Sequence, residues 1–336
     1  MIQHTDNNTF HALLVEEKEK GIFSRRIASR HIDELPAGDV LLRVHYSSLN
    51  YKDALSASGN RGVTRRYPHT PGIDAAGVVV ESNDPRWQHG QEVLACCYDL
   101  GMNTAGGFGQ FIRVPAGWVM AKPAGLSLRK CMIIGTAGFT AAQCIAAIRE
   151  HPVQTTDGKI LVTGATGGVG TMAVALLAKL DYKVTAVTGK REQEQFLRGL
   201  GASEVIDRIQ AVDQSGRMML KGKWAGVVDT VGGEVLATAI KSTRYGGVVT
   251  ACGNAASADL PLNVYPFILR AVSLVGIDSA ECPMANRQRI WQRLAEDWRP
   301  SDLEQFANEI SLDRLPEAID TMLAGRHRGR TVINLG

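Results

Sequence analysis

The chain has 336 residues, of which 45% are hydrophobic and 21% charged, and its formal net charge is +3. This length accommodates two ordinary domains, each with its own core. Such a small net charge is not typical of nucleic-acid-binding or membrane-surface proteins, so we expect neither partner. No apolar run reaches the length of a membrane span, and the N-terminus lacks a signal-peptide pattern. We therefore expect a cytoplasmic protein.

Six cysteines are scattered along the chain, without a CxxC pair and without a Cys/His array at zinc spacing. A disulfide between the adjacent Cys96 and Cys97 would be strained. We expect reduced and mostly buried thiols, as is usual in a reducing compartment. We expect no metal site.

The N-terminal part of the chain, from residue 9 to about residue 128, is rich in short β-strand patterns separated by Gly, Pro and Asp/Asn. The expected strands are residues 40–46, 77–81, 92–96 and 109–114. This rhythm predicts a compact, partly closed barrel. A helical stretch is expected to begin at Ser127 and to run to residue 148.

From Lys159 onward, strand and helix patterns alternate, which predicts a doubly wound parallel sheet. Amphipathic helices follow from about residue 280, and the chain ends in an extended segment that we expect to return to the first domain. The fold class is therefore α/β, with residues 1–128 plus 280–336 as one domain and residues 129–279 as the nucleotide-binding domain. The expected strands are 159–163, 183–187, 204–206, 226–230, 247–252, 273–277 and 330–334, and the expected helices are 168–180, 191–199, 233–242, 286–297, 303–309 and 315–324.

A glycine-rich turn joins the first strand of the predicted nucleotide-binding domain to its first helix. Gly164, Gly167 and Gly170 have the GxxGxxG spacing. Such a turn lets the backbone approach a pyrophosphate and directs the positive end of the helix at it. The alternative is a tight turn that only packs a helix on a sheet. On the first interpretation, the cofactor-binding residues here are Gly164, Thr166, Gly167, Gly168, Val169 and Gly170.

The second strand ends where this fold places the adenine ribose, and it is followed by basic residues rather than by a carboxylate. Thr188, Gly189, Lys190 and Arg191 precede Glu192. Cations there suit a 2′-phosphate, so we predict NADPH in preference to NADH. The alternative is a solvated basic helix start, although cations are mildly unfavourable at a helix N-terminus.

Further cofactor contacts are expected at the carboxyl ends of the other strands of this sheet. Arg208 follows the third strand and is a candidate for the adenine side. Asp229 ends the fourth strand, and Cys252 and Gly253 end the fifth. Tight-turn chemistry explains the glycines at these positions equally well.

Four segments carry a resemblance to a known family: residues 47–53, 71–74, 135–140 and 163–170. With the domain layout, they resemble the medium-chain dehydrogenase/reductase superfamily, in which a GroES-like barrel precedes an inserted Rossmann domain. Within it the chain resembles the quinone-oxidoreductase branch and, more narrowly, the acrylyl-CoA reductase subgroup. Zinc alcohol dehydrogenases of this superfamily have Gly-His-Glu where this chain has Gly72-Ile73-Asp74. They have a cysteine ligand where this chain has Asn50-Tyr51-Lys52.

The resemblance implies NADPH-dependent reduction of the activated C=C bond of acrylyl-CoA, or of a similar short enoyl-CoA, without a metal. It implies catalytic roles for Asn50, Tyr51 and Asp53, with Tyr51 also beside the cofactor, and a cofactor contact for Thr136. Helix capping is the alternative for Asn50, Asp53 and Thr136. One arginine cluster is expected to bind the CoA phosphates, either Arg65 and Arg66 beside Arg61, or Arg326, Arg328 and Arg330. A solvated basic surface is the alternative.

Two other functions remain open at this point. The same scaffold could reduce a quinone or a small enone, or it could be a non-catalytic NADPH-binding sensor. We also expect a homodimer, because residues 273–277 form a plausible apolar edge strand that is a hazard unless paired.

Overall fold

The computed structural model describes residues 8–336, and the chain divides into two compact units. The first unit extends to Thr136 and includes residues 280–289 and 303–336, and the second comprises residues 137–279 and 290–302. Two segments fall in the other unit from the one that the sequence division gave them: residues 129–136 lie in the first unit, and residues 290–302 lie in the second. The domain boundaries drawn from the sequence otherwise stay a prediction.

The first unit is built on a seven-stranded sheet in the order β14-β15-β3-β4-β5-β7, with β6 paired to β3. A separate hairpin of β1 and β2 joins it through the hydrogen bond from Leu13 N to Phe108 O. Buried side chains such as Leu42 and Phe108 form its core. The expected β-rich N-terminal domain is confirmed. Its strands are β1 (Thr9–Glu19), β2 (Ile22–His31), β3 (Val40–Leu49), β4 (Asp74–Ser82), β5 (Glu92–Cys96), β6 (Phe111–Val114), β7 (Val119–Ala121), β14 (Ala307–Ser311) and β15 (Arg330–Asn334), and its helices include α1 (Tyr51–Ala57) and α8 (Leu315–Leu323).

The C-terminal strand returns to this sheet as expected, because β15 pairs with β3 in antiparallel register, Val332 opposite Ser48. The helix expected over residues 303–309 is wrong. Residues Glu304–Phe306 form a single 3-10 turn, and β14 then pairs with β15 in parallel. Leu303 and Phe306 are both buried, and their three-residue spacing imitates the apolar face of a helix.

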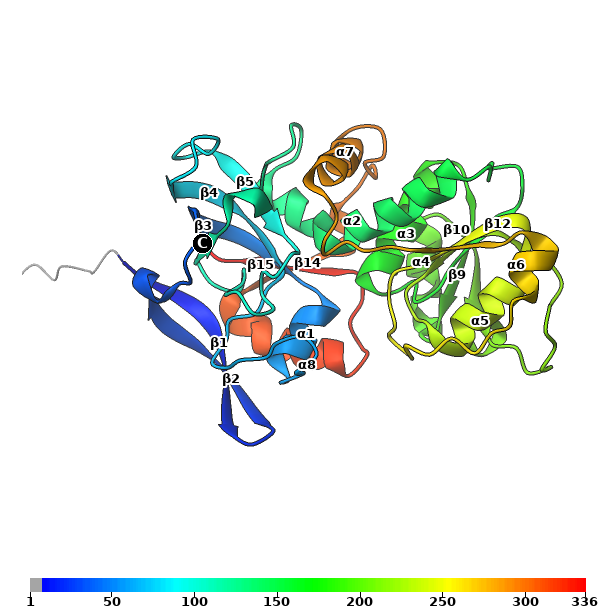
Figure 1. Cartoon of the computed structure of the whole chain (residues 1–336), viewed down its shortest axis with the longest axis horizontal. Helices are drawn as coiled ribbons and strands as arrows, with labels where there is room; N and C mark the ends of the chain where they lie inside the picture. The colour runs from blue at the N-terminus through cyan, green and yellow to red at the C-terminus, as the bar shows by residue number, and fades with distance from the viewer. Residues whose placement is uncertain (1–7) are drawn as a thin grey trace, which may run out of the picture. The chain divides into compact units, whose positions relative to one another are not determined.

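The second unit contains six parallel strands in the order β10-β9-β8-β11-β12-β13, with helices packed on the sheet (Figure 1). This is the expected doubly wound sheet, in which the strand order reverses between β8 and β11. The strands are β8 (Lys159–Val162), β9 (Lys183–Thr188), β10 (Ala202–Asp207), β11 (Trp224–Asp229), β12 (Thr243–Ala251) and β13 (Ser273–Gly276), and the helices include α3 (Gly168–Lys179), α4 (Glu194–Gly199), α5 (Gly233–Lys241), α6 (Tyr265–Arg270) and α7 (Met284–Ala295), of which α7 begins in the first unit.

Helix α2 (Leu128–Glu150) is long and apolar enough to cross a membrane, contrary to our expectation that no segment would be. Most of it, 83% of the apolar window, is buried inside the fold, as in the core helix of a globular protein. Gly135 breaks its helical geometry with φ 49° and ψ −162°. A Cβ at Gly135 would lie 2.7 Å from polar atoms of Arg330, Asp74 and Ser48, so only glycine fits this kink.

Candidate active site

The glycine-rich turn of the second unit has the geometry of a pyrophosphate site. Gly164 adopts φ +58°, and a Cβ at Gly170 would lie 2.3 Å from Gly164 O, so the first glycine makes the tight turn and the third packs the helix against it. A Cβ at Gly167 would meet only Gly164 O, at 3.3 Å, so the middle of the turn is less crowded than its two ends. No side chain caps α3, so its first amide groups are available to an anion. These residues fit the phosphates of a dinucleotide.

The basic residues after β9 lie beside the end of β10, where Thr188 is opposite Asp207. The Arg191 guanidinium is 83% exposed and pairs with the Asp207 carboxylate at 3.0 Å, while the Arg208 guanidinium lies directly over Gly189. A Cβ at Gly189 would approach Arg208 Nε to 2.5 Å. Partial burial lowers the pKa of Lys190. Arg191 and Arg208 lie around the Asp207 carboxylate, and these two cations place positive charge at the position expected for a 2′-phosphate.

Asp207 is a member of this cluster that the sequence did not reveal. Its carboxylate accepts hydrogen bonds from Ile209 N at 2.9 Å and from Arg191 Nε at 3.0 Å, and these two bonds lower its pKa. A cavity of about 220 Å³ opens here, at the carboxyl ends of β9 and β10, and is lined by Thr188, Arg191, Glu194, Val205, Ile206, Asp207 and Gln210.

Asp229 is fully buried, and its carboxylate contacts residues that follow the ends of the neighbouring strands β8 and β11. Its carboxylate accepts from Thr163 Oγ1 at 2.7 Å and from Gly232 N at 2.8 Å, and burial raises its pKa. The Cys252 thiol donates to Asp229 O at 3.2 Å, and a Cβ at Gly253 would lie 2.5 Å from Thr230 O. Asp229 therefore stabilises the turn, and Cys252 and Gly253 stay predicted cofactor contacts.

A buried polar network in the first unit centres on the Asp74 carboxylate. It accepts hydrogen bonds from Ser48 Oγ at 2.6 Å, Asn50 Nδ2 at 2.8 Å and Thr136 Oγ1 at 2.6 Å. The Thr136 amide adds a bond at 3.0 Å. Thr136, predicted as a cofactor contact, thus holds Asp74 with both its amide and its hydroxyl.

Asn50 and Asp53 form a capping box at the start of α1. The Asp53 carboxylate accepts from Asn50 N and from Ile73 N, each at 2.8 Å, and it is fully buried. The Asn50 amide donates to Asp74 and accepts from Arg330 Nη1 at 3.1 Å. Both ends of that amide are therefore engaged within the protein, so Asn50 positions its neighbours.

Arg330 is the buried cation of this network, and it is 1% exposed. Its guanidinium donates to Ser48 Oγ at 2.7 Å and to Ile133 O at 3.0 Å, and it lies 3.8 Å from Asp74 Oδ2. Our interpretation of Arg330 as part of a surface arginine cluster is wrong, because the central strand β15 carries its side chain into the interior. Only a knowledge of the strand pairing could have shown this.

Tyr51 differs from its neighbours because its side chain is exposed, at 49%. Within residues 8–336 its hydroxyl has no hydrogen-bond partner. Arg65 and Arg66 are also exposed, and the described part of the chain gives neither guanidinium an ion pair. Arg61, in contrast, pairs with Glu17 and lies over the Tyr67 ring. Tyr51, Arg65 and Arg66 are thus the candidates whose polar groups are free to meet a ligand.

The zinc positions of the related alcohol dehydrogenases do not fit a metal in this chain. Ile73 has no ligand atom, and the Asn50 amide nitrogen donates to Asp74. Within the described residues, no group of three or more His, Cys, Asp or Glu side chains could hold a metal ion.

The raised pKa of Asp53 predicts a pH dependence of stability. Burial, with a smaller contribution from Asp74, raises this pKa to about 7. The protonated form is therefore favoured on folding, and the stability present below pH 4 is lost as the pH rises toward 7. In urea unfolding, the free energy of unfolding of the wild-type protein should fall by about 2 kcal/mol between pH 5 and 7.5. Asp53→Asn should not show this fall. The exposed Asp313→Asn variant should keep the wild-type slope; equal slopes in all three proteins would contradict this assignment.

These features define a two-domain oxidoreductase that depends on a nicotinamide cofactor. They are the glycine turn at a helix N-terminus, the basic residues where the adenine ribose is expected, and a GroES-like domain with a buried polar network. Residues 36–124 match the family described as alcohol dehydrogenase GroES-like domain, and residues 168–296 match zinc-binding dehydrogenase. AcuI of Escherichia coli (strain K12), named as an acrylyl-CoA reductase, is 46% identical over 96% of this chain and 99% of its own length. YhfP of Bacillus subtilis (strain 168), whose name places it among the quinone oxidoreductases, is 42% identical over 98% of this chain and its own full length.

Solved structures agree with these relatives. E. coli K-12 YHDH with bound NADPH superimposes with a TM-score of 0.94, at 45% identity over 97% of this chain and all of that chain. B. subtilis yhfP with NAD bound gives a TM-score of 0.94, at 43% identity over 97% of this chain and 99% of that chain. The chain belongs to the medium-chain dehydrogenase/reductase superfamily, in its zinc-free branch.

Proposed function

We propose that this protein uses NADPH to reduce the C=C bond of acrylyl-CoA, or of a similar short enoyl-CoA, to the saturated thioester. The observation that carries the proposal is the replacement of a metal site by the buried network of Asn50, Asp74 and Arg330. Such a site has no Lewis acid to polarise an alcohol, whereas an activated alkene accepts hydride without one. The full-length similarity to a relative named acrylyl-CoA reductase supports this substrate class.

The residues of this chain bind, orient and polarise the reactants. NADPH, when bound, supplies the hydride for the β-carbon. A proton from water completes the reduction at the α-carbon, so that two electrons and two hydrogens are added. Tyr51, with its free exposed hydroxyl, is the donor we assign to the thioester oxygen, where negative charge develops. Asn50 and Asp53 fix the start of α1 and thereby hold Tyr51 in place.

Steady-state assays of NADPH consumption test the proposal. We expect kcat/KM for acrylyl-CoA to exceed that for benzoquinone and for a small enone, and to fall as the enoyl chain lengthens. Tyr51→Phe should lower kcat for acrylyl-CoA by about 10-fold or more, because it removes one donor to the developing oxyanion. Turnover on quinones alone would favour the second candidate, a quinone reductase, for which the similarity to YhfP is the supporting observation. Tight NADPH binding without turnover on any acceptor would favour a sensor.

Arg65 and Arg66 are proposed to contact the CoA phosphates, because they are exposed and free of ion pairs within residues 8–336. Replacing both by Ala is expected to raise KM for acrylyl-CoA by about 10-fold, with little change for a quinone that lacks phosphates. Arg86→Ala, at an exposed arginine paired with Asp84, is the matched control and should change neither KM. Equal losses on both substrates would assign these arginines a structural role.

We propose that the protein is a homodimer that pairs through β13, the last strand of the six-stranded sheet. Leu274 on this strand is 37% exposed, and Ile268 and Leu269 of the neighbouring α6 are 67% and 60% exposed. An uncovered apolar edge favours pairing. Leu274→Asp should then halve the mass measured by light scattering. We also propose a cytoplasmic location, which the absence of a disulfide within residues 8–336 supports.

A further inference from the structure

A cavity of the second unit lies at the amino ends of the parallel strands, whereas the glycine-rich turn lies at their carboxyl ends. It has a volume of about 1050 Å³, and it is lined by the first residues of three parallel strands, Lys159 of β8, Lys183 of β9 and Trp224 of β11. The glycine turn follows the carboxyl end of β8, where dinucleotides bind in this fold. This cavity is therefore a separate feature, and nothing in the proposed function uses it.

The lining of this cavity is strongly cationic. It contains five cationic side chains and two carboxylates, Glu204 and Asp213, a formal excess of three positive charges. Both carboxylates are already engaged: Glu204 pairs with Lys159 at 3.0 Å, and Asp213 pairs with Lys241 at 3.2 Å. Within the described residues, the ammonium groups of the other three lining lysines form no ion pair; these are Lys183, Lys221 and Lys223.

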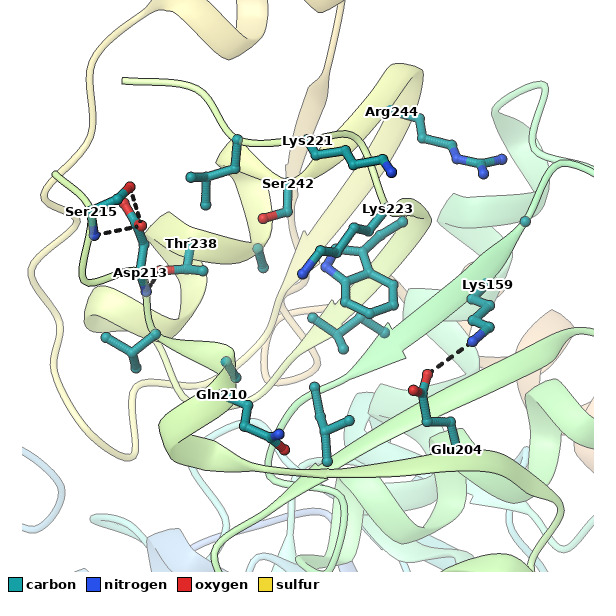
Figure 2. Close-up of a pocket in the computed structure, with 18 of the residues that line it drawn as sticks. Lys159, Glu204, Gln210, Asp213, Ser215, Lys221, Lys223, Thr238, Ser242 and Arg244 are labelled. Atoms are coloured by element: carbon teal, nitrogen blue, oxygen red, sulfur yellow. Dashed lines mark hydrogen bonds and ion pairs between the residues drawn. The ribbon is translucent and has the colours of Figure 1, made fainter. Parts of the chain in front are cut away.

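Ser242 and Lys223 are neighbouring polar residues in the lining of the cavity. Ser242 is 4% exposed, and no hydrogen bond to its hydroxyl is present within residues 8–336. In Figure 2, Ser242 and Lys223 are drawn near one another above Gln210, and Arg244 lies apart from them. The backbone fixes the pair, because Lys223 N donates to Ser242 O at 2.7 Å. A hydroxyl that faces a cavity and has no partner within residues 8–336, near an ammonium group without an ion pair, gives an anion two hydrogen-bond donors.

Part of the lining is apolar, and polar side chains such as Gln210 and Thr238 lie beside it. Leu161, Ala211 and Ala239 are buried side chains that line the cavity, and Trp224 adds a partly buried aromatic ring. Small-molecule sites typically combine such an apolar wall with a few convergent polar groups, in volumes of roughly 300–1,000 Å³.

We propose that this cavity binds a small amphipathic organic anion, in which a phosphate, sulfonate or carboxylate is attached to an apolar or aromatic body. Lys223 and Ser242 hold the anionic group, and Trp224 with the aliphatic side chains contacts the body. A nucleoside monophosphate and a medium-chain fatty acid share this chemistry, and competition distinguishes them.

The test is a fluorescence titration of the full-length protein with anilinonaphthalene sulfonate, in saturating NADP⁺ so that the nucleotide site is filled. We expect saturable one-site binding, and a dissociation constant about 10-fold higher or more in Lys223→Ala and in Ser242→Ala. Lys179→Ala removes an exposed lysine at the end of α3 and is the matched control, for which no change is expected. Lys223 is itself exposed, so its replacement should leave the fold intact.

Adenosine monophosphate and dodecanoate are then added as competitors. Displacement by the first identifies a nucleotide-type ligand, and displacement by the second an acyl-type ligand; either result supports the proposal. Three results would overturn it: no saturable binding in the presence of NADP⁺, unchanged affinity in Lys223→Ala, or failure of both competitors. These readouts do not involve turnover, so they are independent of the proposed enzyme activity.

Discussion

Arg330→Met is expected to lower the free energy of unfolding by about 3–5 kcal/mol, because it leaves a buried carboxylate without its cation. The Arg330 guanidinium lies 3.8 Å from Asp74, and both side chains are buried. Methionine fills a similar volume but leaves the carboxylate without its cation. It also removes donors from Ser48 Oγ, Asn50 Oδ1 and the carbonyl of Ile133. Urea unfolding at pH 7.5 measures this loss.

Arg326→Met is the matched control, because Arg326 is an exposed arginine close to Arg330 in the chain. Its expected effect is within about 0.5 kcal/mol. The double variant Arg330→Met with Asp74→Asn should be less destabilised than the sum of the two single variants, by about 1 kcal/mol or more. The reason is that losing the charge of one partner makes loss of the other less costly. If Arg330→Met were no more destabilising than the control, Arg330 would not be the counter-ion of this network.

The nucleotide half of the site could be predicted because its signals are local in sequence. Gly164, Gly167 and Gly170 lie within seven residues, and their spacing predicts a turn that lets the backbone approach a pyrophosphate. In the structure Gly164 makes the tight turn, and a Cβ at Gly170 would clash with Gly164 O. The basic residues Lys190 and Arg191 after β9 could be predicted for the same reason. Asp207 was not, because only the parallel pairing of β9 with β10 brings it to Arg191.

The network of the first unit was only partly predictable. Asn50 and Asp53 form a local capping box, which the sequence suggested as the alternative to catalysis. Arg330 is 280 residues from Asn50, and its role depends on the return of β15 to β3. A charged residue in a polar tail is normally exposed. The sequence therefore offered no sign that this arginine is buried while Arg326 and Arg328 are exposed.

Replacing both Arg191 and Arg208 by Ala is expected to raise the dissociation constant for NADPH by about 10- to 100-fold and that for NADH by less than about 3-fold. The reason is that a 2′-phosphate accepts charge-assisted hydrogen bonds that a 2′-hydroxyl does not need. The side chains are exposed, so the NADPH affinity should also weaken as salt is added. Titration of cofactor fluorescence at two ionic strengths measures both effects. Arg198→Ala, on the exposed face of α4, is the matched control.

Asp207→Asn is expected to change the dissociation constant for NADPH in the opposite direction. The Asp207 carboxylate competes with a phosphate for Arg191, since the two side chains are only 3.0 Å apart. Removing this negative charge should therefore tighten NADPH binding by about 2- to 5-fold, at an exposed pair whose net energy is small. The affinity for NADH should stay near the wild-type value. Suppose instead that the double arginine variant and Asp207→Asn each changed the affinities for NADPH and NADH equally. The basic residues after β9 would then act on the adenine or the pyrophosphate, and the 2′-phosphate would have to be recognised elsewhere in the second unit.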